Sequence, residues 1–337
     1  MVNINNIRLT ASEITNLWTT YMNDSINDCL MSHFLQHCID TDVKPKIEQA
    51  IKIARKHKEQ LSMIFNYENI PIPDAFSIDK DVNLDSPKLF ADTLALVYLK
   101  DMSIFGISAY GQAVSTSARS DITDFFVQCL NDTTKLQVDV IQTLQQKGVY
   151  IRIPYMTKPD KVEYVKKGFL TGWFGDRRAL TGLEITHLCV NYQHNALGKA
   201  ILIGFSQVSQ SKEVINYFLR GIELSNSIMA LIEDKLTEGF VPHPLTWDNG
   251  VLNSTVNTFS EKLMMALITG IATSSIGNYG IALGFSARRD IAALYAKFIK
   301  DAGQFSEDGA NILIKNEWME KPPQSDDKLK LAKQKHQ

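Results

Sequence analysis

An internal repeat constrains this chain of 337 residues more than any other feature of its sequence. The segment LTASEIT at 9–15 returns as LTGLEIT at 180–186, 171 residues later. From Phe90 onward the shift is 169, and it aligns SARSDI at 117–122 with SARRDI at 286–291. A match this long, with one small deletion in a loop, indicates two copies of one structural unit.

Each copy divides into four long stretches of helical character, with hardly any strand alternation. Thr10 with Glu13, and Thr181 with Glu184, have the spacing of a capping box at a helix start. Long helices of similar length, joined mostly by short connections, favour an antiparallel four-helix bundle. The sequence therefore predicts an all-α protein of two tandem ferritin-like four-helix bundles, with helices at 11–38, 43–68, 87–115, 119–148, 182–209, 213–239, 256–284 and 288–317.

The predicted domain organisation follows the repeat. We expect the first bundle at 1–155 and the second at 180–325. Residues 156–179 form a linker that contains the aromatic and basic segment GWFGDRR, and 326–337 form a basic, disordered tail. Proline-containing segments, PIP in the first copy and PHP in the second, end the second helix of each copy. Each opens a long link to the third helix, as in the ferritin-like connection.

Composition excludes several classes of protein. The 35 basic and 37 acidic side chains nearly cancel, which argues against broad nucleic-acid binding. No secretory signal is recognisable at the N-terminus, and no apolar run is long and unbroken enough to span a membrane. Four cysteines without a CxxC pair indicate buried thiols in a reducing compartment, so we expect a cytoplasmic protein.

Several segments resemble a known bacterial family. They are GWFGDRRALTGLEITHL, NALGKAILIGFSQV, KLMMALITG and EDGANILIKNEW, all in or just before the second copy. They are similar to the domain of unknown function 3231, found in spore-forming bacilli with two ferritin-like repeats and with members labelled as spore-coat components. The resemblance implies the fold and a sporulation context, and it implies no activity.

A metal site is one hypothesis for the first copy. Ferritin-like bundles often hold two Fe or Mn ions with Glu and Glu-x-x-His ligands that point inward from their helices. Asp24, His57, Asp101 and Asp132 are expected near the middle of the four helices, where they would share one layer. The alternative is that one or more of these side chains turn outward from the bundle interior. The second copy has Asn195, Ile228, Gly270 and Asp301 at these positions, which would not bind a metal.

Glycines recur in the third helix of the second copy, at positions 270, 277, 280 and 284. Because glycine is costly within a helix, something should compensate for it. Close packing of neighbouring helices is one explanation. A small-molecule groove beside Tyr279 and Gly280 is the other.

The linker carries Trp173, Phe174, Arg177 and Arg178. Large aromatic side chains in an ordered linker are usually buried. We therefore expect these residues to join the two bundles, or alternatively to form a contact for a protein partner.

No catalytic motif is recognisable, because no nucleophile elbow, phosphate-binding loop or dinucleotide fingerprint is present. The preferred hypothesis is a non-enzymatic structural or interaction protein, cytoplasmic or spore-associated, with protein partners or self-association and without a cofactor. Two alternatives remain open: a degenerate ferritin-like metal-binding protein with Fe or Mn in the first bundle, and a small-molecule-binding helical bundle.

Overall fold

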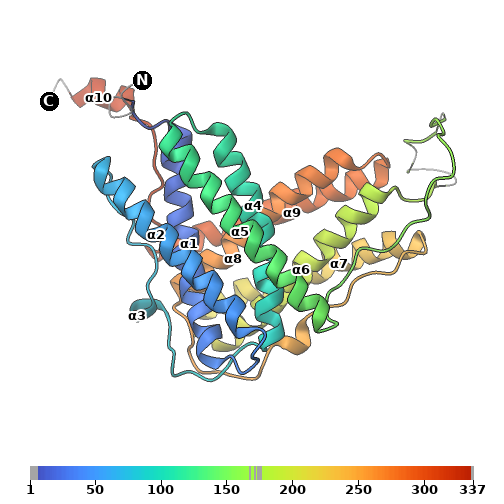
Figure 1. Ribbon diagram of the computed structural model, residues 1–337, viewed down its shortest axis with the longest axis horizontal. Helices are drawn as coiled ribbons and strands as arrows, with labels where there is room; N and C mark the ends of the chain where they lie inside the picture. Colours follow the sequence, from blue (N-terminus) through green and yellow to red (C-terminus); the bar gives the residue numbers. More distant parts are fainter. Residues whose placement is uncertain (1–6, 167, 171, 173–176, 335–337) are drawn as a thin grey trace.

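The computed structural model describes residues 7–166, 168–170, 172 and 177–334. These residues form two tandem four-helix bundles and contain no β-strand, which confirms the predicted all-α class (Figure 1). Every predicted long helix is present within a few residues of its expected ends. The first bundle consists of α1 (Ala11–His37), α2 (Lys44–Tyr67), α4 (Asp92–Thr116) and α5 (Ser120–Gln146). The second consists of α6 (Gly182–Val208), α7 (Lys212–Glu238), α8 (Glu261–Phe285) and α9 (Arg289–Lys315).

Three short elements lie outside the bundles. They are α3 (Ile78–Asp81), the 3-10 helix η2 (Asp248–Gly250) and α10 (Lys328–Gln334). The first two lie in the long links between the second and third helices of each copy. Helix α10 lies where a tail without regular structure is expected, so the structure differs from that expectation.

The helix starts confirm the predicted capping boxes. Thr10 accepts a hydrogen bond from the Glu13 amide at 3.2 Å, and the Glu13 carboxylate accepts one from the Thr10 amide at 2.7 Å. Thr181 and Glu184 repeat this arrangement at 3.2 and 2.8 Å. Each box satisfies two amides that the first turn of a helix leaves without partners.

The two long links pair with each other in the region where the bundles meet. The Asn83 amide donates to the Thr258 carbonyl at 2.8 Å, and the Leu252 amide donates to the Leu89 carbonyl at 2.9 Å. The shift of 169 also holds within these links, where residue 83 corresponds to 252 and 89 to 258, and it exchanges the two bonds. The bonds Ser260 to Asp81 and Ala91 to Gly250 are exchanged in the same way. The copies therefore meet about an approximate two-fold axis, as the subunits of an isologous dimer do.

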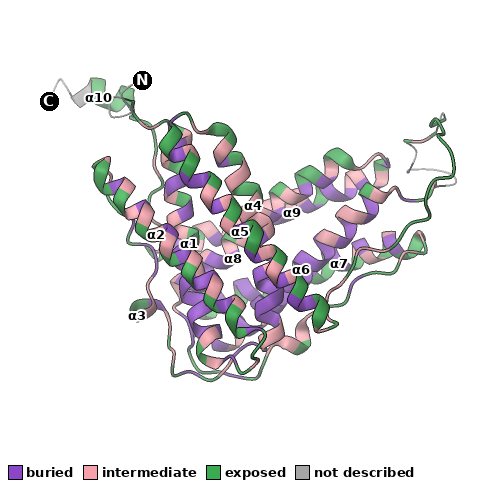
Figure 2. Cartoon of the chain, in the orientation of Figure 1, coloured by how far each residue is buried: buried purple, intermediate pink, exposed green. Residues whose placement is uncertain are grey.

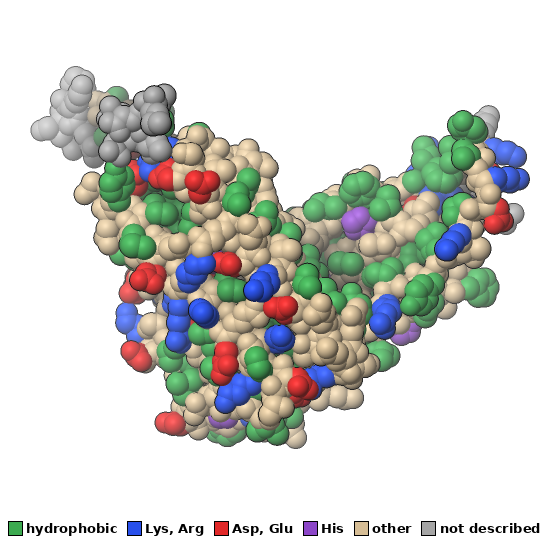
Figure 3. Space-filling view, in the orientation of Figure 1, with side chains coloured by type: hydrophobic (Ala, Val, Ile, Leu, Met, Phe, Trp, Pro, Cys, Tyr) green, Lys and Arg blue, Asp and Glu red, His purple; other side chains and the backbone are tan. Residues whose placement is uncertain are grey.

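The largest hydrophobic cluster draws residues from both bundles. Within it, the Phe205 ring contacts a ring from each copy, with ring centroids 6.2 Å from Phe90 and 5.7 Å from Phe259. Buried positions concentrate at this shared base, and the bundles diverge from it (Figure 2). The space-filling view shows the notch that this divergence leaves between them (Figure 3). Two smaller clusters lie apart from it, one within the second bundle and one within the first.

Helix α8 is the one described helix that is long and apolar enough to cross a membrane by composition. It packs against α9 and α6 as a member of the second bundle, and a single helix of this kind is weak evidence of a membrane span. The described residues therefore contain no clear membrane span. All four cysteines are free and buried, as predicted.

Candidate functional site

A small, partly open cavity lies among the four long helices of each bundle. The first-bundle cavity measures about 70 Å³ and the second-bundle cavity about 50 Å³. All 13 residues that line the first correspond, by the repeat shifts of 171 and 169, to residues that line the second. Ala50 corresponds in this way to Gly221, and Gly106 to Ser275. The second-bundle cavity adds His194 and Ile228 to its lining.

One residue type is identical in both walls. Tyr110 and Tyr279 occupy corresponding positions, while every other pair of lining residues differs. Protein interiors are close-packed and hold few voids. Two cavities at the same place in two diverged copies are therefore a feature that the duplication retained.

Tyr279 and Gly280, predicted beside a groove, separate in the structure. Tyr279 lines the second-bundle cavity, whereas Gly280 is exposed and a Cβ atom there would meet nothing within 4 Å. The same holds for Gly270, Gly277 and Gly284, so close helix packing does not explain these glycines. All four glycines are exposed, on the outer face of α8. Successive positions on a helix are about 100° apart, so Gly280 faces away from the cavity that Tyr279 lines.

A chain of hydrogen bonds reaches the wall of the second-bundle cavity. Asp101 Oδ2 lies 2.6 Å from His194 Nδ1, and His194 Nε2 lies 2.8 Å from Ser275 Oγ. Beside them, Asn195 Nδ2 donates to the Tyr279 hydroxyl at 2.9 Å. These side chains are buried, and burial raises the pKa of Tyr279 to about 12. The cavity thus has a polar group of fixed geometry on one side.

The order Asp–His–Ser also occurs in serine hydrolases, where His accepts the Ser proton and Asp orients the His. Acyl transfer further needs donors that hold the developing oxyanion, most often backbone N–H groups. Ser275 lies in the interior of α8, and its hydroxyl is 2.9 Å from the Ile271 carbonyl. Backbone N–H groups inside a helix are already bonded to carbonyls one turn earlier. The arrangement is therefore suited to hydrogen bonding with a ligand.

Sequence reasoning missed His194 and Ser275. They lie 81 residues apart and have no motif in common. A signal was available in α6, where the polar residues Asn191, Gln193, His194 and Asn195 occur in one apolar helix, and the structure buries all four. Buried polar side chains need partners, so such a run points to a site.

The predicted metal ligands of the first bundle do not meet as one group. Asp24 Oδ2 lies 3.2 Å from His57 Nδ1, and Asp132 Oδ2 lies 3.9 Å from His57 Nε2. Asp101 is elsewhere, because its face of α4 packs towards α6 of the second bundle, where it contacts His194. Placing Asp101 in this layer was therefore wrong. Across the described ranges, no group of three or more His, Cys, Asp or Glu could hold a metal ion.

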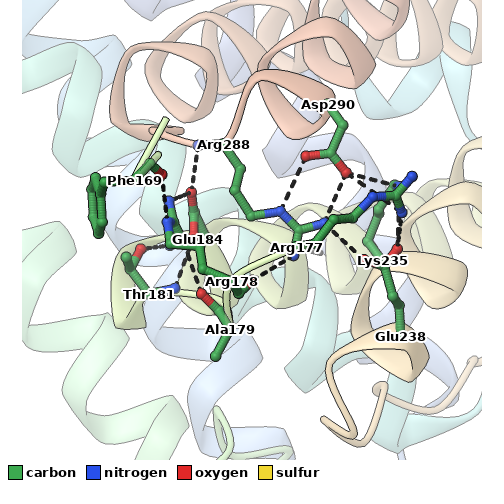
Figure 4. A network of polar contacts seen from close by, with 10 residues as sticks. All are labelled: Phe169, Arg177, Arg178, Ala179, Thr181, Glu184, Lys235, Glu238, Arg288 and Asp290. Atoms are coloured by element: carbon green, nitrogen blue, oxygen red, sulfur yellow. Dashed lines mark hydrogen bonds and ion pairs between the residues drawn. The ribbon is translucent and has the colours of Figure 1, made fainter. Parts of the chain in front are cut away.

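The linker arginines bind the end of their own bundle (Figure 4). Arg178 donates to both carboxylate oxygens of Glu184 at 2.8 Å, and Arg177 donates to Glu238. Burial would raise the pKa of Glu184, but hydrogen bonds from Arg178 and from the Thr181 and Arg288 amides lower it to about 2. Neither arginine contact joins the two bundles. Trp173 and Phe174 lie outside the described residues.

A second pair of arginines recurs at the short turns before α5 and α9. Arg119 binds Asp121 and Glu68, and Arg288 binds Asp290 and Glu238. Each also donates to a backbone carbonyl, that of Ile7 or Arg178, at 3.2 Å. Both arginines are almost completely buried, so these contacts are structural.

The repeat also appears in comparison with known proteins. A family described as protein of unknown function (DUF3231) matches the chain twice, over residues 1–162 and 168–331. The chain belongs to this family. The two matches confirm the duplication, and the family name assigns no activity to this DUF3231 protein.

One solved structure shows a distant likeness. It is described as a "putative spore coat protein" from Bacillus halodurans C-125, is 19% identical, and superposes with a TM-score of 0.42. The match covers 46% of this chain and 100% of the other. A likeness this distant carries no argument about function. None of the curated proteins compared with the chain matches it.

Proposed function

We propose that this DUF3231 protein is a non-enzymatic ligand-binding protein. Its second-bundle cavity holds a small, mainly apolar molecule with one hydroxyl or carbonyl group. The observation that supports this function is the cavity at the same place in both copies. A purely structural bundle gains stability when such voids are filled, so a retained void favours a binding role.

The chemistry of the walls defines the ligand class. Most of the lining is apolar and includes Leu202, Ile228, Ile268 and Phe305. Small-molecule sites typically combine apolar walls with a few well-placed polar groups. Such a lining favours a compact hydrocarbon skeleton of a few carbon atoms.

The polar side of the cavity defines the single functional group. Ser275 and Tyr279 present hydroxyls that can donate to or accept from a ligand oxygen. Their positions are held by His194 and Asn195, and Asp101 holds His194 from the other bundle. Because these groups are already positioned, a ligand hydroxyl would be bound with little further loss of side-chain entropy.

Titration with isobutanol tests this function, with binding followed by ligand-observed NMR. Gly198 lines the cavity, and a Cβ atom there would lie 3.9 Å from Ile271 Cγ2 in ordinary contact. Gly198→Ala should therefore reduce the cavity without distorting the bundle and weaken isobutanol binding at least tenfold. Binding that is unchanged in Gly198→Ala would contradict the proposal.

A spore-coat role is a separate prediction, made from the family resemblance. A tagged copy followed through sporulation should then become concentrated at the spore surface. A diffuse signal confined to vegetative cells would contradict the coat role and leave the ligand-binding proposal unaffected.

A further inference from the structure

We infer that the first-bundle cavity is a second ligand site, selective for a small organic cation such as a primary ammonium ion. Its 13 lining positions all recur in the second-bundle cavity, but its wall carries a carboxylate, Asp24, where the other wall carries Asn195. The same cavity is thus present twice with different charge.

Asp24 is a buried carboxylate with one open oxygen. Its side chain is nine-tenths buried, and Oδ2 lies 3.2 Å from His57 Nδ1. Among the described residues, no hydrogen bond reaches Oδ1. Burial also raises the pKa of Asp24, which reflects the cost of a carboxylate that is only partly satisfied. A donor supplied by a ligand would satisfy the open oxygen.

The basic side chains nearby are already occupied. Asp28 pairs with Arg55 and Lys58 at 2.8 and 2.7 Å. Lys56 pairs with Asp132 at 2.9 Å. Asp24 has no Lys or Arg partner within ion-pair distance in the described part of the chain.

His57 satisfies only part of the site. It contacts Asp24 through Nδ1, while its Nε2 is buried and has no hydrogen-bond partner in the described residues. The rings of Tyr110 and Phe125 surround the imidazole at 6.0 and 6.1 Å. A cationic ligand at the open Oδ1 would supply the positive charge that a buried carboxylate prefers.

The remaining wall suits an ammonium group. Thr133 and Asn27 line the cavity and carry oxygen atoms that can accept N–H bonds. Tyr110 adds an aromatic ring, to which a cation is attracted. Gly106 leaves open the space that Ser275 fills in the other copy.

The test compares isobutylammonium with isobutanol, which share one carbon skeleton, at pH 7. In the first-bundle cavity of the wild-type protein, isobutylammonium should bind at least tenfold more tightly than isobutanol. Asp24→Asn should remove that preference. Gly198→Ala, in the other cavity, should leave isobutylammonium binding unchanged, which separates this inference from the proposed function.

A second variant blocks the space without changing the charge. A Cβ atom at Gly106 would lie 3.1 Å from Thr133 Cγ2 and 3.6 Å from the Tyr110 ring, so Gly106→Ala should weaken isobutylammonium binding at least tenfold. If Asp24→Asn does not unfold cooperatively, and so is not properly folded, Gly106→Ala provides the test of the inference. Isobutylammonium binding that is unchanged in either folded variant, or displaced by equimolar Mn²⁺, would overturn the inference.

Discussion

Asp101 and His194 lie 2.6 Å apart, Oδ2 to Nδ1, although they belong to different bundles. Asp101 is on α4 and His194 on α6, and both side chains are almost fully buried. The second nitrogen of His194 contacts Ser275 in the wall of the second-bundle cavity. One imidazole therefore links the junction of the bundles to the candidate ligand site.

Asp101→Asn should destabilise the protein. An amide at this position lacks the negative charge that now faces His194 Nδ1, and its NH2 group cannot accept a hydrogen bond. A poorly satisfied buried group costs about 1–3 kcal/mol. Urea unfolding monitored by circular dichroism gives the free energy of unfolding. As a control, Asp308→Asn removes an exposed pair with Arg220 and should cost less than about 1 kcal/mol. Equal effects of the two variants would contradict a special role for the buried pair.

Two glycines of the second-bundle cavity should respond in opposite ways to alanine. At Gly198 the added Cβ has room, so Gly198→Ala should raise the free energy of unfolding by up to about 1 kcal/mol through helix propensity. At Gly221 the Cβ would lie 2.7 Å from the Phe305 ring and 2.9 Å from Leu202, so overpacking should cost about 1–3 kcal/mol. Melting temperatures of the two variants check this, and a shift of the same sign in both would contradict the cavity geometry.

The correspondence between the two copies predicts a stabilising substitution at the start of α4. Ser260 caps α8, accepting from the Leu263 amide at 3.1 Å, whereas its counterpart Ala91 begins α4 without a side-chain cap. Ala91→Ser should therefore stabilise the protein by about 0.5–1 kcal/mol, and Ser260→Ala should destabilise it by about 1–2 kcal/mol. Ser260 also donates to Asp81 at 2.6 Å, so its loss should have the larger effect. Urea midpoints that do not move in opposite directions would show that the two starts are not equivalent.

Glu184 should contribute to stability in a pH-dependent way. Its folded pKa of about 2 lies below its ordinary value of 4.5, so the folded state holds its proton less tightly. The stabilisation is fully present above pH 4.5 and is lost as the pH falls from 4.5 towards 2.

Glu184→Gln should therefore be less stable than wild type at pH 7, and the difference should shrink as the pH falls below 4.5. Urea unfolding at pH 7, 4.5 and 3 measures this trend. The exposed Glu223, changed to Gln, is the control and should show almost no difference. A Glu184→Gln difference that is constant over the range would contradict the assigned pKa.

Ser275 should resist a fluorophosphonate probe. Its hydroxyl is buried within helix α8, next to the Ile271 carbonyl, and backbone donors for an oxyanion are not available there. Mass spectrometry after incubation should find Ser275 unmodified, with a serine hydrolase as the positive control. Stoichiometric labelling of Ser275 that is lost in His194→Ala would contradict the non-enzymatic binding function and support acyl transfer instead.

Much of the fold could be predicted from the sequence because its signals are local. Capping boxes such as Thr10 with Glu13 depend on side chains three residues apart, and proline ends a helix wherever it occurs. The repeat itself is a property of the sequence alone. The eight long helices and their division into two copies follow from these signals.

The candidate sites depend on helix phase and on packing between helices, which a linear pattern does not define. One step along α8 separates Tyr279, in the cavity wall, from Gly280, on the surface. Asp101 lies near the middle of the third helix, a position that predicts it in the polar layer of the first bundle. The structure turns Asp101 towards α6, because α4 also packs against the second bundle. The sequence by itself determined two copies of one helical unit. Only the tertiary structure decided that each copy has a cavity and that the His194 imidazole connects Asp101 of the first bundle to the cavity wall of the second. The cavities and this connection depend on contacts between residues far apart in the chain.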